Sequence, residues 1–298
     1  MKFIKFWMIF CVFTQTAFLY ASTSFVTYNI RTFDHKSNST NKEELLSIFN
    51  KLNADFITVE EIVNANSFKE FVSTKLKNYN LYLSRCGGAG RQKIGFMYAK
   101  RKYKLLKAYE DHRLANPNNS STKGCGRLRP ALVGHFQEIK TRRKFTVIGL
   151  HLKAGSSLTS YDQRAVQYNL MEELVYELKK EGRRDIILMG DLNTTGYNKG
   201  DIDYRNFSEM LRKIDAQTAS KSLKCSSYWS GLDINDNKEE SSPLDHIVFE
   251  KGFLGSRYSK TKLHSFCQKL RCREVSSLTL GIQYKEVSDH CPVKVEFY

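Results

Sequence analysis

The clearest structural signal in this sequence is Ile186-Ile187-Leu188-Met189-Gly190-Asp191-Leu192-Asn193-Thr194-Thr195-Gly196. Its first four residues are apolar, a run too short for a helix, and Gly190 ends it, so the pattern predicts a buried strand. The strand would deliver Asp191 and Asn193 to the edge of a sheet. A carboxylate can hold a metal ion or orient a water molecule, whereas an amide donates to an anionic oxygen without adding charge. Asp and Asn also build ordinary turns, so other parts of the chain must distinguish these alternatives.

The first 21 of the 298 residues have the pattern of an export signal. Lys2 and Lys5 precede an apolar segment from Phe6 to Tyr20, and Ala21-Ser22 supplies small residues at a cleavage position. We therefore expect residues 1–21 to be removed as a signal peptide and the protein to be secreted or periplasmic. A retained N-terminal anchor is the alternative, although the segment is short for a membrane span and polar residues interrupt it.

The remaining residues, 22–298, contain no linker or repeat, so we expect them to form one domain and a monomer with no stable protein partner. The formal net charge of the full chain is +16, and loss of Lys2 and Lys5 leaves +14. Such an excess attracts nucleic acid or an anionic membrane surface, although it also serves simply to keep a protein soluble. We expect the basic residues 100–129 to form an exposed, loop-rich excursion. No segment of the mature chain is apolar enough to span a membrane.

Six cysteines remain in the expected mature chain, namely Cys86, Cys125, Cys225, Cys267, Cys272 and Cys291. An even number in an exported protein predicts disulfides, whose connectivity the sequence leaves open. The absence of a C-x-x-C pair gives no support to a zinc site. We predict Cys86–Cys125 as one pair because both cysteines lie in glycine-rich stretches.

Alternating apolar patterns indicate an α/β protein with mixed sheets. Strands are predicted near residues 24–30, 55–59, 79–83, 94–98, 131–137, 144–152, 186–189, 244–249 and 291–297, and helices near 40–52, 67–77, 161–180 and 204–214. Thr40, with Glu43 three residues later, is predicted to cap the first helix. A Ser/Asn/Asp-rich stretch, 220–242, precedes the strand at 244–249.

Polar side chains suited to catalysis stand at the ends of several predicted strands. They are Asn29, Glu61, His151, Asp191 with Asn193, Asp245, and Asp289 with His290. Each has a structural explanation when taken alone: Glu61 could begin a helix, His151 could be a core histidine, and an aspartate could end a strand. Together they indicate one site, because strand ends on one side of a sheet meet at a common cleft.

The motifs around these residues resemble, in order, those of the endonuclease/exonuclease/phosphatase superfamily, also called deoxyribonuclease-I-like. They are Tyr28-Asn29-Ile30, Val59-Glu60-Glu61-Ile62, Gly149-Leu150-His151, Gly190-Asp191-Leu192-Asn193, Leu244-Asp245-His246 and Ser288-Asp289-His290-Cys291-Pro292-Val293. The resemblance covers residues 28–293 and is specific because the whole set occurs in the family order. It implies a four-layer α-β-β-α sandwich with two mixed central sheets, and the export signal suggests a secreted bacterial-type member.

The resemblance also implies hydrolysis of a phosphoester with a divalent cation, normally Mg²⁺, with Mn²⁺ or Ca²⁺ as alternatives. By motif, Glu61 would bind the cation with Asn29 beside it, and Asp289 would offer a further contact. Carboxylates are the protein ligands that Mg²⁺ prefers, so the residue types agree with this assignment.

By motif, Asp191 would position or deprotonate the attacking water, and Asn193 would contact the phosphate. His290, oriented by Asp245, and His151 would act at the phosphate or leaving group, since histidine titrates near neutrality. The sequence leaves open which histidine is the acid and which is the base.

Other residues near these motifs leave alternatives open. Arg127 and Arg129 both match the family's arginine-before-proline phosphate contact. Gln92 stands where deoxyribonuclease I has a glutamate that supports the first histidine, a departure from that subfamily. Arg164 and Gln167 fit either structural supports facing the site or an ordinary solvated helix face.

We therefore expect a secreted, nonspecific endonuclease that hydrolyses DNA, RNA or both, with the basic excursion following the phosphate backbone near the scissile bond. The alternative within the superfamily is a phosphatase or a sphingomyelinase-like phospholipid phosphodiesterase. A catalytically silent binding protein is a third hypothesis. The presence of every motif residue argues against it.

Overall fold

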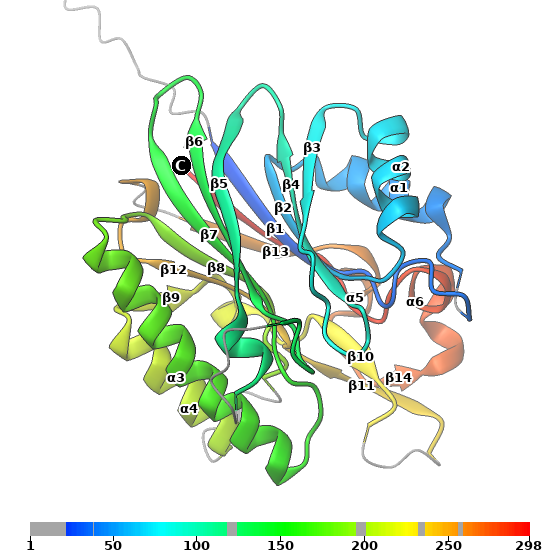
Figure 1. The fold of residues 1–298 in the computed structure, drawn as a ribbon. Helices are drawn as coiled ribbons and strands as arrows, with labels where there is room; N and C mark the ends of the chain where they lie inside the picture. Colours follow the sequence, from blue (N-terminus) through cyan, green and yellow to red (C-terminus); the bar gives the residue numbers. More distant parts are fainter. Residues whose placement is uncertain (1–21, 38, 118–123, 195–200, 232–235, 256–258) are drawn as a thin grey trace, which may run out of the picture.

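The computed structural model describes residues 22–37, 39–117, 124–194, 201–231, 236–255 and 259–298, so the expected signal peptide lies outside the described residues. Two six-stranded sheets pack face to face (Figure 1). The first sheet has the order β13 (Ser259–Leu263), β15 (Val293–Phe297), β1 (Thr23–Asn29), β2 (Phe56–Ile62), β4 (Lys93–Ala99), β3 (Tyr79–Leu83). The second has the order β5 (Tyr103–Asp111), β6 (Ala131–Glu138), β7 (Lys144–His151), β8 (Ile186–Asp191), β12 (Asp245–Glu250), β9 (Ala216–Thr218).

Both sheets are mixed, as predicted. The pairs β1–β2 and β7–β8 are parallel, whereas β15 and β12 run antiparallel to their neighbours β1 and β8. A third, smaller sheet contains β10 (Ser227–Trp229), β11 (Lys238–Ser242) and β14 (Val275–Ser276). This small sheet lies below the two large sheets in Figure 1, near α5 (Ser265–Leu270) and α6 (Gly281–Glu286).

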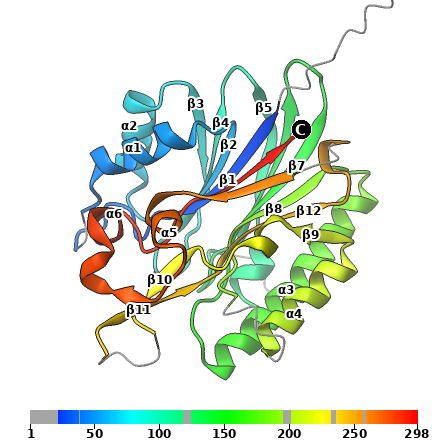
Figure 2. The same ribbon diagram turned by 180° about the vertical axis from the view of Figure 1, so that it is seen from behind.

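Helices cover the outer faces of both large sheets, which confirms the four-layer sandwich (Figures 1 and 2). On the first sheet, α1 (Lys42–Leu52) and α2 (Ala65–Lys75) bury an apolar face against outward-facing strand residues such as Val26 and Ile57. On the second, α3 (Leu158–Lys180) and α4 (Ile202–Lys213) do the same against Ile148 and Leu188. In the described chain, no helix combines the length and hydropathy required to cross a membrane.

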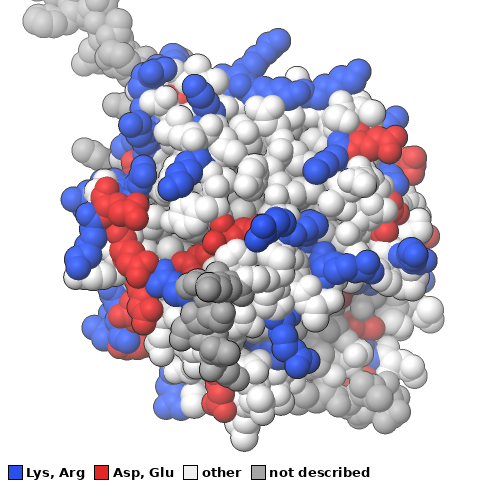
Figure 3. All heavy atoms as spheres, in the orientation of Figure 1, with Lys and Arg blue, Asp and Glu red and all other residues white. Residues whose placement is uncertain are grey.

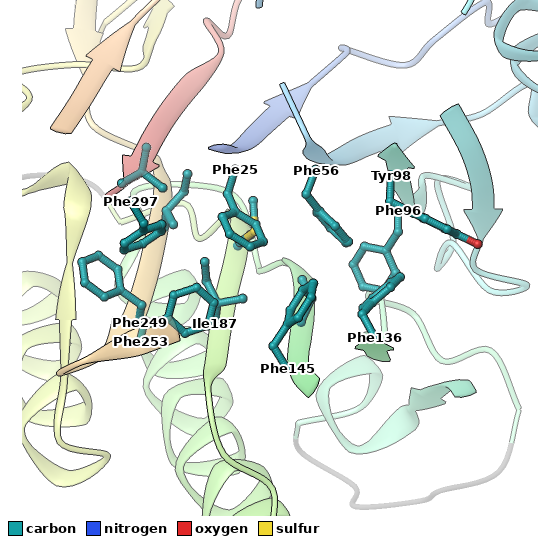
Figure 4. Close-up of a cluster of buried hydrophobic side chains, with 14 of the residues drawn as sticks. Phe25, Phe56, Phe96, Tyr98, Phe136, Phe145, Ile187, Phe249, Phe253 and Phe297 are labelled. Carbon is teal, nitrogen blue, oxygen red and sulfur yellow. The ribbon is translucent and has the colours of Figure 1, made fainter. Parts of the chain in front are cut away.

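Aromatic side chains fill the space between the sheets (Figure 4). Phe56 from the first sheet meets Phe136 from the second edge-on, with ring centroids 4.9 Å apart. Because side chains alternate along a strand, Phe56, Thr58 and Glu60 of β2 all face this inner layer, and all three are fully buried. The apolar core thus gives way to polar groups at one end of the sandwich.

The structure corrects several local predictions. The cap of α1 is Asn41, whose side chain accepts from the Glu44 amide, and not Thr40. The expected excursion at 100–129 contains the nine-residue strand β5, at the edge of the second sheet, and a short 3-10 helix, His112–Ala115. The stretch 220–242 contains β10 and β11.

Three disulfides are formed, and the predicted pair Cys86–Cys125 is one of them. The others, Cys225–Cys272 and Cys267–Cys291, lie in a cluster with Tyr228 and Phe266 beneath the small sheet. The two bridges restrict the unfolded chain and so add to the stabilisation that this apolar cluster provides.

Candidate active site

The topology brings the predicted residues to one end of the sandwich. Asn29 ends β1 beside Glu60 of the parallel strand β2. His151 ends β7 beside Asp191, the last residue of the parallel strand β8, and Asp245 begins the antiparallel strand β12 opposite Asp191. The segment before β15 is fixed to β1 by the Ser288 hydroxyl, which donates to the Asn29 carbonyl at 2.7 Å.

Asn29 links the carboxylates of the two sheets. Its Nδ2 donates to Glu61 Oε1 at 3.1 Å and to Asp191 Oδ2 at 3.0 Å. The other Glu61 oxygen accepts from the Thr32 amide at 2.8 Å. Glu61 has a left-handed φ of 61° where the pairing register of β2 shifts, so its side chain turns out of the alternating row of the strand.

His290 forms the closest pair in the site. Its Nδ1 lies 2.8 Å from Asp245 Oδ2, and its Nε2 lies 3.8 Å from Asp191 Oδ2. Burial alone lowers the pKa of His290, but the carboxylates of Asp245 and Asp191 raise it well above the ordinary value. The geometry therefore favours a positively charged imidazolium with Nε2 directed towards Asp191.

His151 has the opposite electrostatic environment. Its Nε2 lies 3.6 Å from Asp191 Oδ2 and 3.7 Å from Glu61 Oε1. Burial, together with the positive charges of Arg129 and His290, lowers the pKa of His151 well below the ordinary value, so the ring is neutral. Its buried Nδ1 has no hydrogen-bond partner in the described part of the chain, so Gln92 does not support this histidine.

Asp191 stands at the centre of these contacts. Burial raises its pKa to about 7, even though the neighbouring His290 lowers it. Its Oδ1 accepts from the Asn193 amide at 2.9 Å, and Asn193 has a left-handed φ of 52°. The Asn193 side chain reaches the Leu152 carbonyl at 3.3 Å. Asp191 and Asn193 thus form a compact turn at the end of β8, directed towards the same end of the sandwich.

The two arginines before Pro130 differ in position. Arg129 is partly buried, and its guanidinium donates to the carbonyls of His151, at 3.1 Å, and Leu152. Arg127 is exposed, and its backbone joins the loop that Cys86–Cys125 holds. The structure therefore places Arg129, and not Arg127, against the predicted catalytic residues.

A divalent cation would find oxygen ligands at the junction of the sheets. Glu61 and Asp191 present carboxylate oxygens to the same Asn29 amide, and that amide could offer its own oxygen to an ion if it rotated. Asp245 adds a buried carboxylate whose negative charge raises the pKa of Asp191. These residues fit a hard cation.

The structure brings together a set of possible metal ligands that differs from the predicted set of Asn29, Glu61 and Asp289. Asp191, Asp245 and His290 present ligand atoms within 4.8 Å of one another, although His290 is already hydrogen-bonded to Asp245. Asp289 is partly exposed on the segment before β15, and its backbone carbonyl accepts from the Tyr228 amide at 2.9 Å. The assignment of Asp289 as a further cation ligand stays a prediction.

Arg164 and Gln167 are supports and not a solvated helix face, since both are completely buried. Gln167 accepts from the Lys153 amide at 3.0 Å and donates to the Leu114 carbonyl at 2.9 Å. Arg164 pairs with buried Asp203, the two groups approaching to 2.9 Å. These contacts tie α3 and α4 to the loop that follows His151.

Glu60 is a site residue that the sequence analysis did not assign. Its carboxyl group is fully buried below Asp245 and Asp191, and Thr27 donates to one of its oxygens at 3.0 Å. Burial and then the charge of Asp245 raise its pKa well above the ordinary value, so Glu60 is neutral. The alternation of β2 could have identified it, because Phe56, Thr58 and Glu60 share one face.

A cavity of about 1040 Å³ opens beside the catalytic residues. Asn193, Asp289 and His290 line its inner end. Its walls come from the first turns of α3 and α4 on one side and from β10 and β11 on the other. A substrate that reached His290 would therefore extend along the small sheet.

The sequence profile of the Endonuclease/Exonuclease/phosphatase family matches residues 26–290. None of the curated protein sequences matches this chain significantly. Truncated Caenorhabditis elegans TDP2 has a similar structure, with 15% identity, 93% of this chain and 97% of that chain covered, and a TM-score of 0.63. An endonuclease/exonuclease/phosphatase family protein from Bacteroides thetaiotaomicron is 18% identical, with 93% of this chain and 94% of that chain covered and a TM-score of 0.62. D. rerio TDP2 complexed with single strand DNA product is 13% identical, with 93% of this chain and 99% of that chain covered and a TM-score of 0.61.

Proposed function

Because the chain belongs to the endonuclease/exonuclease/phosphatase family, we propose that it is a secreted, divalent-cation-dependent phosphodiesterase that hydrolyses nucleic acid. The observation that supports this most strongly is the environment of Asp191. One buried carboxylate oxygen lies 3.6 Å from His151 Nε2, 3.8 Å from His290 Nε2 and 3.0 Å from the Asn29 amide. Asp191 as a base, charged His290 as a donor, and the neutral groups of His151 and Asn29 thus converge at one point. Phosphodiester hydrolysis requires such a combination.

The two histidines take different roles in this proposal. His290, kept charged by Asp245, donates from Nε2 to a phosphate oxygen or to the leaving oxygen. His151 is neutral and acts as a hydrogen-bonding partner without a charge, with Arg129 fixing its end of β7 through the His151 carbonyl. This assignment makes His290 the proton donor, a choice that the sequence left open.

Asp191 is the general base in this proposal. A pKa of about 7 leaves a large fraction of the carboxylate ionised at neutral pH and able to accept a proton from water. Asn193, fixed at the end of β8, directs an uncharged amide towards the phosphate. A divalent cation held by Glu61 with Asn29 beside it, Mg²⁺ being our first choice, would neutralise charge on the scissile phosphate.

The basic hairpin between β4 and β5 lies far from the candidate site, although the expected contact with the phosphate backbone of the nucleic acid requires it to be close. The hairpin that carries Lys100, Arg101 and Lys104 follows β4, and Ala99 donates to the Asp55 carbonyl just before β2 begins. Glu61 stands at the other end of β2, on the order of 20 Å away at about 3.3 Å per residue. Lys and Arg gather along the upper edge of the molecule in Figure 3, the edge formed by this hairpin in Figure 1. For Lys100, Arg101 and Lys104, the expectation that the basic residues of 100–129 follow the phosphate backbone near the scissile bond is therefore wrong, whereas Arg129 of the same range does lie against His151.

The nucleic-acid assignment is supported by two other observations. The full chain has a net charge of +16, which draws polyanions over long range. The D. rerio protein of the same fold was crystallised with a single strand DNA product. Three disulfides support an oxidising location, and N-terminal sequencing of protein recovered outside the cytoplasm should begin near Ser22.

The decisive test offers three substrates under two conditions. Purified protein is incubated with plasmid DNA, with RNA and with sphingomyelin, in Mg²⁺ and in EDTA. The proposal expects cleavage of DNA, RNA or both in Mg²⁺ and none in EDTA. Cleavage of sphingomyelin with both nucleic acids intact would replace it with the phospholipid phosphodiesterase hypothesis, and no cleavage of any substrate would reject it.

A further inference from the structure

The cavity beside His290 contains an aromatic side chain that the proposed reaction does not use. Trp229, at the end of β10, is partly exposed in the cavity wall. Its indole Nε1 donates to the Ser242 hydroxyl at 3.0 Å, so the polar edge of the ring is already satisfied. A tryptophan whose N–H is paired and whose ring remains accessible offers an apolar face to a ligand.

The position of Trp229 is fixed relative to the catalytic histidine. Ser227 and His290 form an antiparallel bridge, and the Cys291 amide donates to the Ser226 carbonyl at 2.7 Å. Trp229 lies two residues beyond Ser227 on the same strand face, about 7 Å further along. A group that stacks on this indole would therefore be one short step from a phosphate at His290.

The small sheet holds Trp229 rigidly before any ligand binds. Trp229 pairs with Glu240 of β11, and its neighbour Tyr228 is buried on the opposite face, where its hydroxyl donates to the Arg273 carbonyl at 2.9 Å. The disulfides Cys225–Cys272 and Cys267–Cys291 join the two sides of this region. A preorganised ring loses little conformational freedom on binding, which favours affinity.

The opposite wall adds two more aromatic residues. Tyr161 of α3 and Tyr204 of α4 both line the cavity. The guanidinium of buried Arg164 lies 5.1 Å from the centre of the Tyr161 ring and restricts where this ring can lie. The cavity is thus bordered by aromatic side chains on both sides, separated from each other by open volume.

The charges around the cavity are few and of both signs. Lys221 and Lys224 are exposed at its rim, and neither forms an ion pair within the part of the chain that the structure describes. Asp201, Glu240 and Asp289 line the same cavity, so carboxylates offset the positive charges of the two lysines and His290. A clamp for duplex DNA relies on many phosphate contacts by Lys and Arg, which this lining lacks. Sites for single strands gain much of their affinity from aromatic side chains on which unpaired bases stack.

We propose that this cavity is a base-stacking subsite that selects single-stranded nucleic acid, with Trp229 as its main specificity residue. The inference rests on the proposed nuclease function and deepens it by naming the substrate class. A base next to the scissile phosphate stacks on the Trp229 ring, a position that a base paired within a duplex cannot reach.

Binding is tested without cleavage. Trp7 and Trp229 are the two tryptophans of the chain, and Trp7 lies in the expected signal peptide, so protein that begins at Ser22 has Trp229 as its only tryptophan. In EDTA, a single-stranded DNA oligonucleotide should quench this fluorescence saturably, and the same oligonucleotide annealed to its complement should quench it much less. Equal quenching by both forms, or none by either, overturns the stacking subsite.

Kinetics give the second test. Trp229→Leu keeps apolar bulk but removes the aromatic face, and should raise KM for the single strand by roughly 5- to 150-fold with kcat nearly unchanged. Trp229→Phe should recover most of the affinity, a rescue that a purely structural role in the small sheet does not predict. An unchanged KM in Trp229→Leu, with active wild-type enzyme, rejects the subsite and leaves the proposed function standing. If the wild-type protein cleaves no nucleic acid, the proposed function fails, and the quenching experiment still decides whether the cavity binds single strands.

Discussion

Replacement of Arg164 by methionine should destabilise this protein more than any ordinary surface substitution. The Arg164 and Asp203 side chains are both completely buried, and Arg164 Nε lies 3.0 and 3.2 Å from the two Asp203 carboxylate oxygens. The same guanidinium donates to the carbonyls of Lys153 at 2.7 Å and Gly155 at 2.8 Å. It therefore joins α3, α4 and the loop after His151 in one buried network.

The magnitude follows from what Arg164→Met leaves behind. Methionine fills a similar volume, but the buried Asp203 carboxylate loses the positive charge of Arg164, a loss that typically costs about 3–5 kcal/mol. The two backbone carbonyls that lose their donor add to this cost, each by roughly 1 kcal/mol. We expect the free energy of unfolding to fall by about 5–7 kcal/mol, a large part of the roughly 5–15 kcal/mol that stabilises a typical domain.

The assay is urea unfolding followed by circular dichroism, with the disulfides intact. A double variant, Arg164→Met with Asp203→Leu, should recover much of the lost stability because no buried charge remains. Arg212→Met is the matched control, since Arg212 pairs with Glu209 on the surface and the two side chains are 71% and 48% exposed. Its unfolding midpoint should not move. A loss below about 1 kcal/mol in Arg164→Met would refute the reasoning, as would a double variant that is no more stable than the single one.

Four further results are expected. His290→Ala should lower kcat by about 10²- to 10⁴-fold while nucleic-acid binding persists. Asp245→Asn should move the alkaline limb of the pH–rate profile to lower pH, because activity that needs charged His290 is lost as pH rises through a pKa that Asp245 raises; an unmoved limb contradicts this. Lys100→Gln with Lys104→Gln should leave KM for short oligonucleotides unchanged, and a several-fold rise would restore the expected contact with the phosphate backbone. Unreduced peptide mapping should show Cys86 linked to Cys125, and free thiols at both positions would exclude that bridge.

The sequence patterns predicted an α/β protein with mixed sheets, the resemblance implied its four layers, and the candidate site residues do meet at one end of the sandwich. Apolar strands that end in a polar residue, such as the one before Asp191, identify both the sheet and the edge where chemistry occurs. The order of the motifs then specifies the two-sheet topology, which local patterns alone do not reveal. His290 and Asp245, 45 residues apart, form a 2.8 Å pair that the resemblance indicated.

Other features depend on tertiary contacts that the sequence does not display. The edge strand β5 carries two lysines, Lys104 and Lys107, and lysine is common on exposed sheet edges, so the composition of the segment resembled that of a loop. Arg164 is buried because Asp203, 39 residues later, lies opposite it on α4. The strand that carries Trp229 lacks a long apolar pattern, since disulfides and hydrogen bonds support the small sheet.

Asp191→Asn tests the central claim most directly, because asparagine keeps the shape of the side chain and removes its ability to accept a proton. The measurement is the initial rate of cleavage of a fluorescently labelled single-stranded oligonucleotide by wild-type and variant protein, in Mg²⁺ and after EDTA. We predict that wild-type activity disappears in EDTA and returns with Mg²⁺, and that the variant, folded and able to bind the oligonucleotide, is slower by about 10²- to 10⁴-fold. A variant that cleaves at the wild-type rate, or wild-type cleavage that continues undiminished in EDTA, would contradict the assignment of this site.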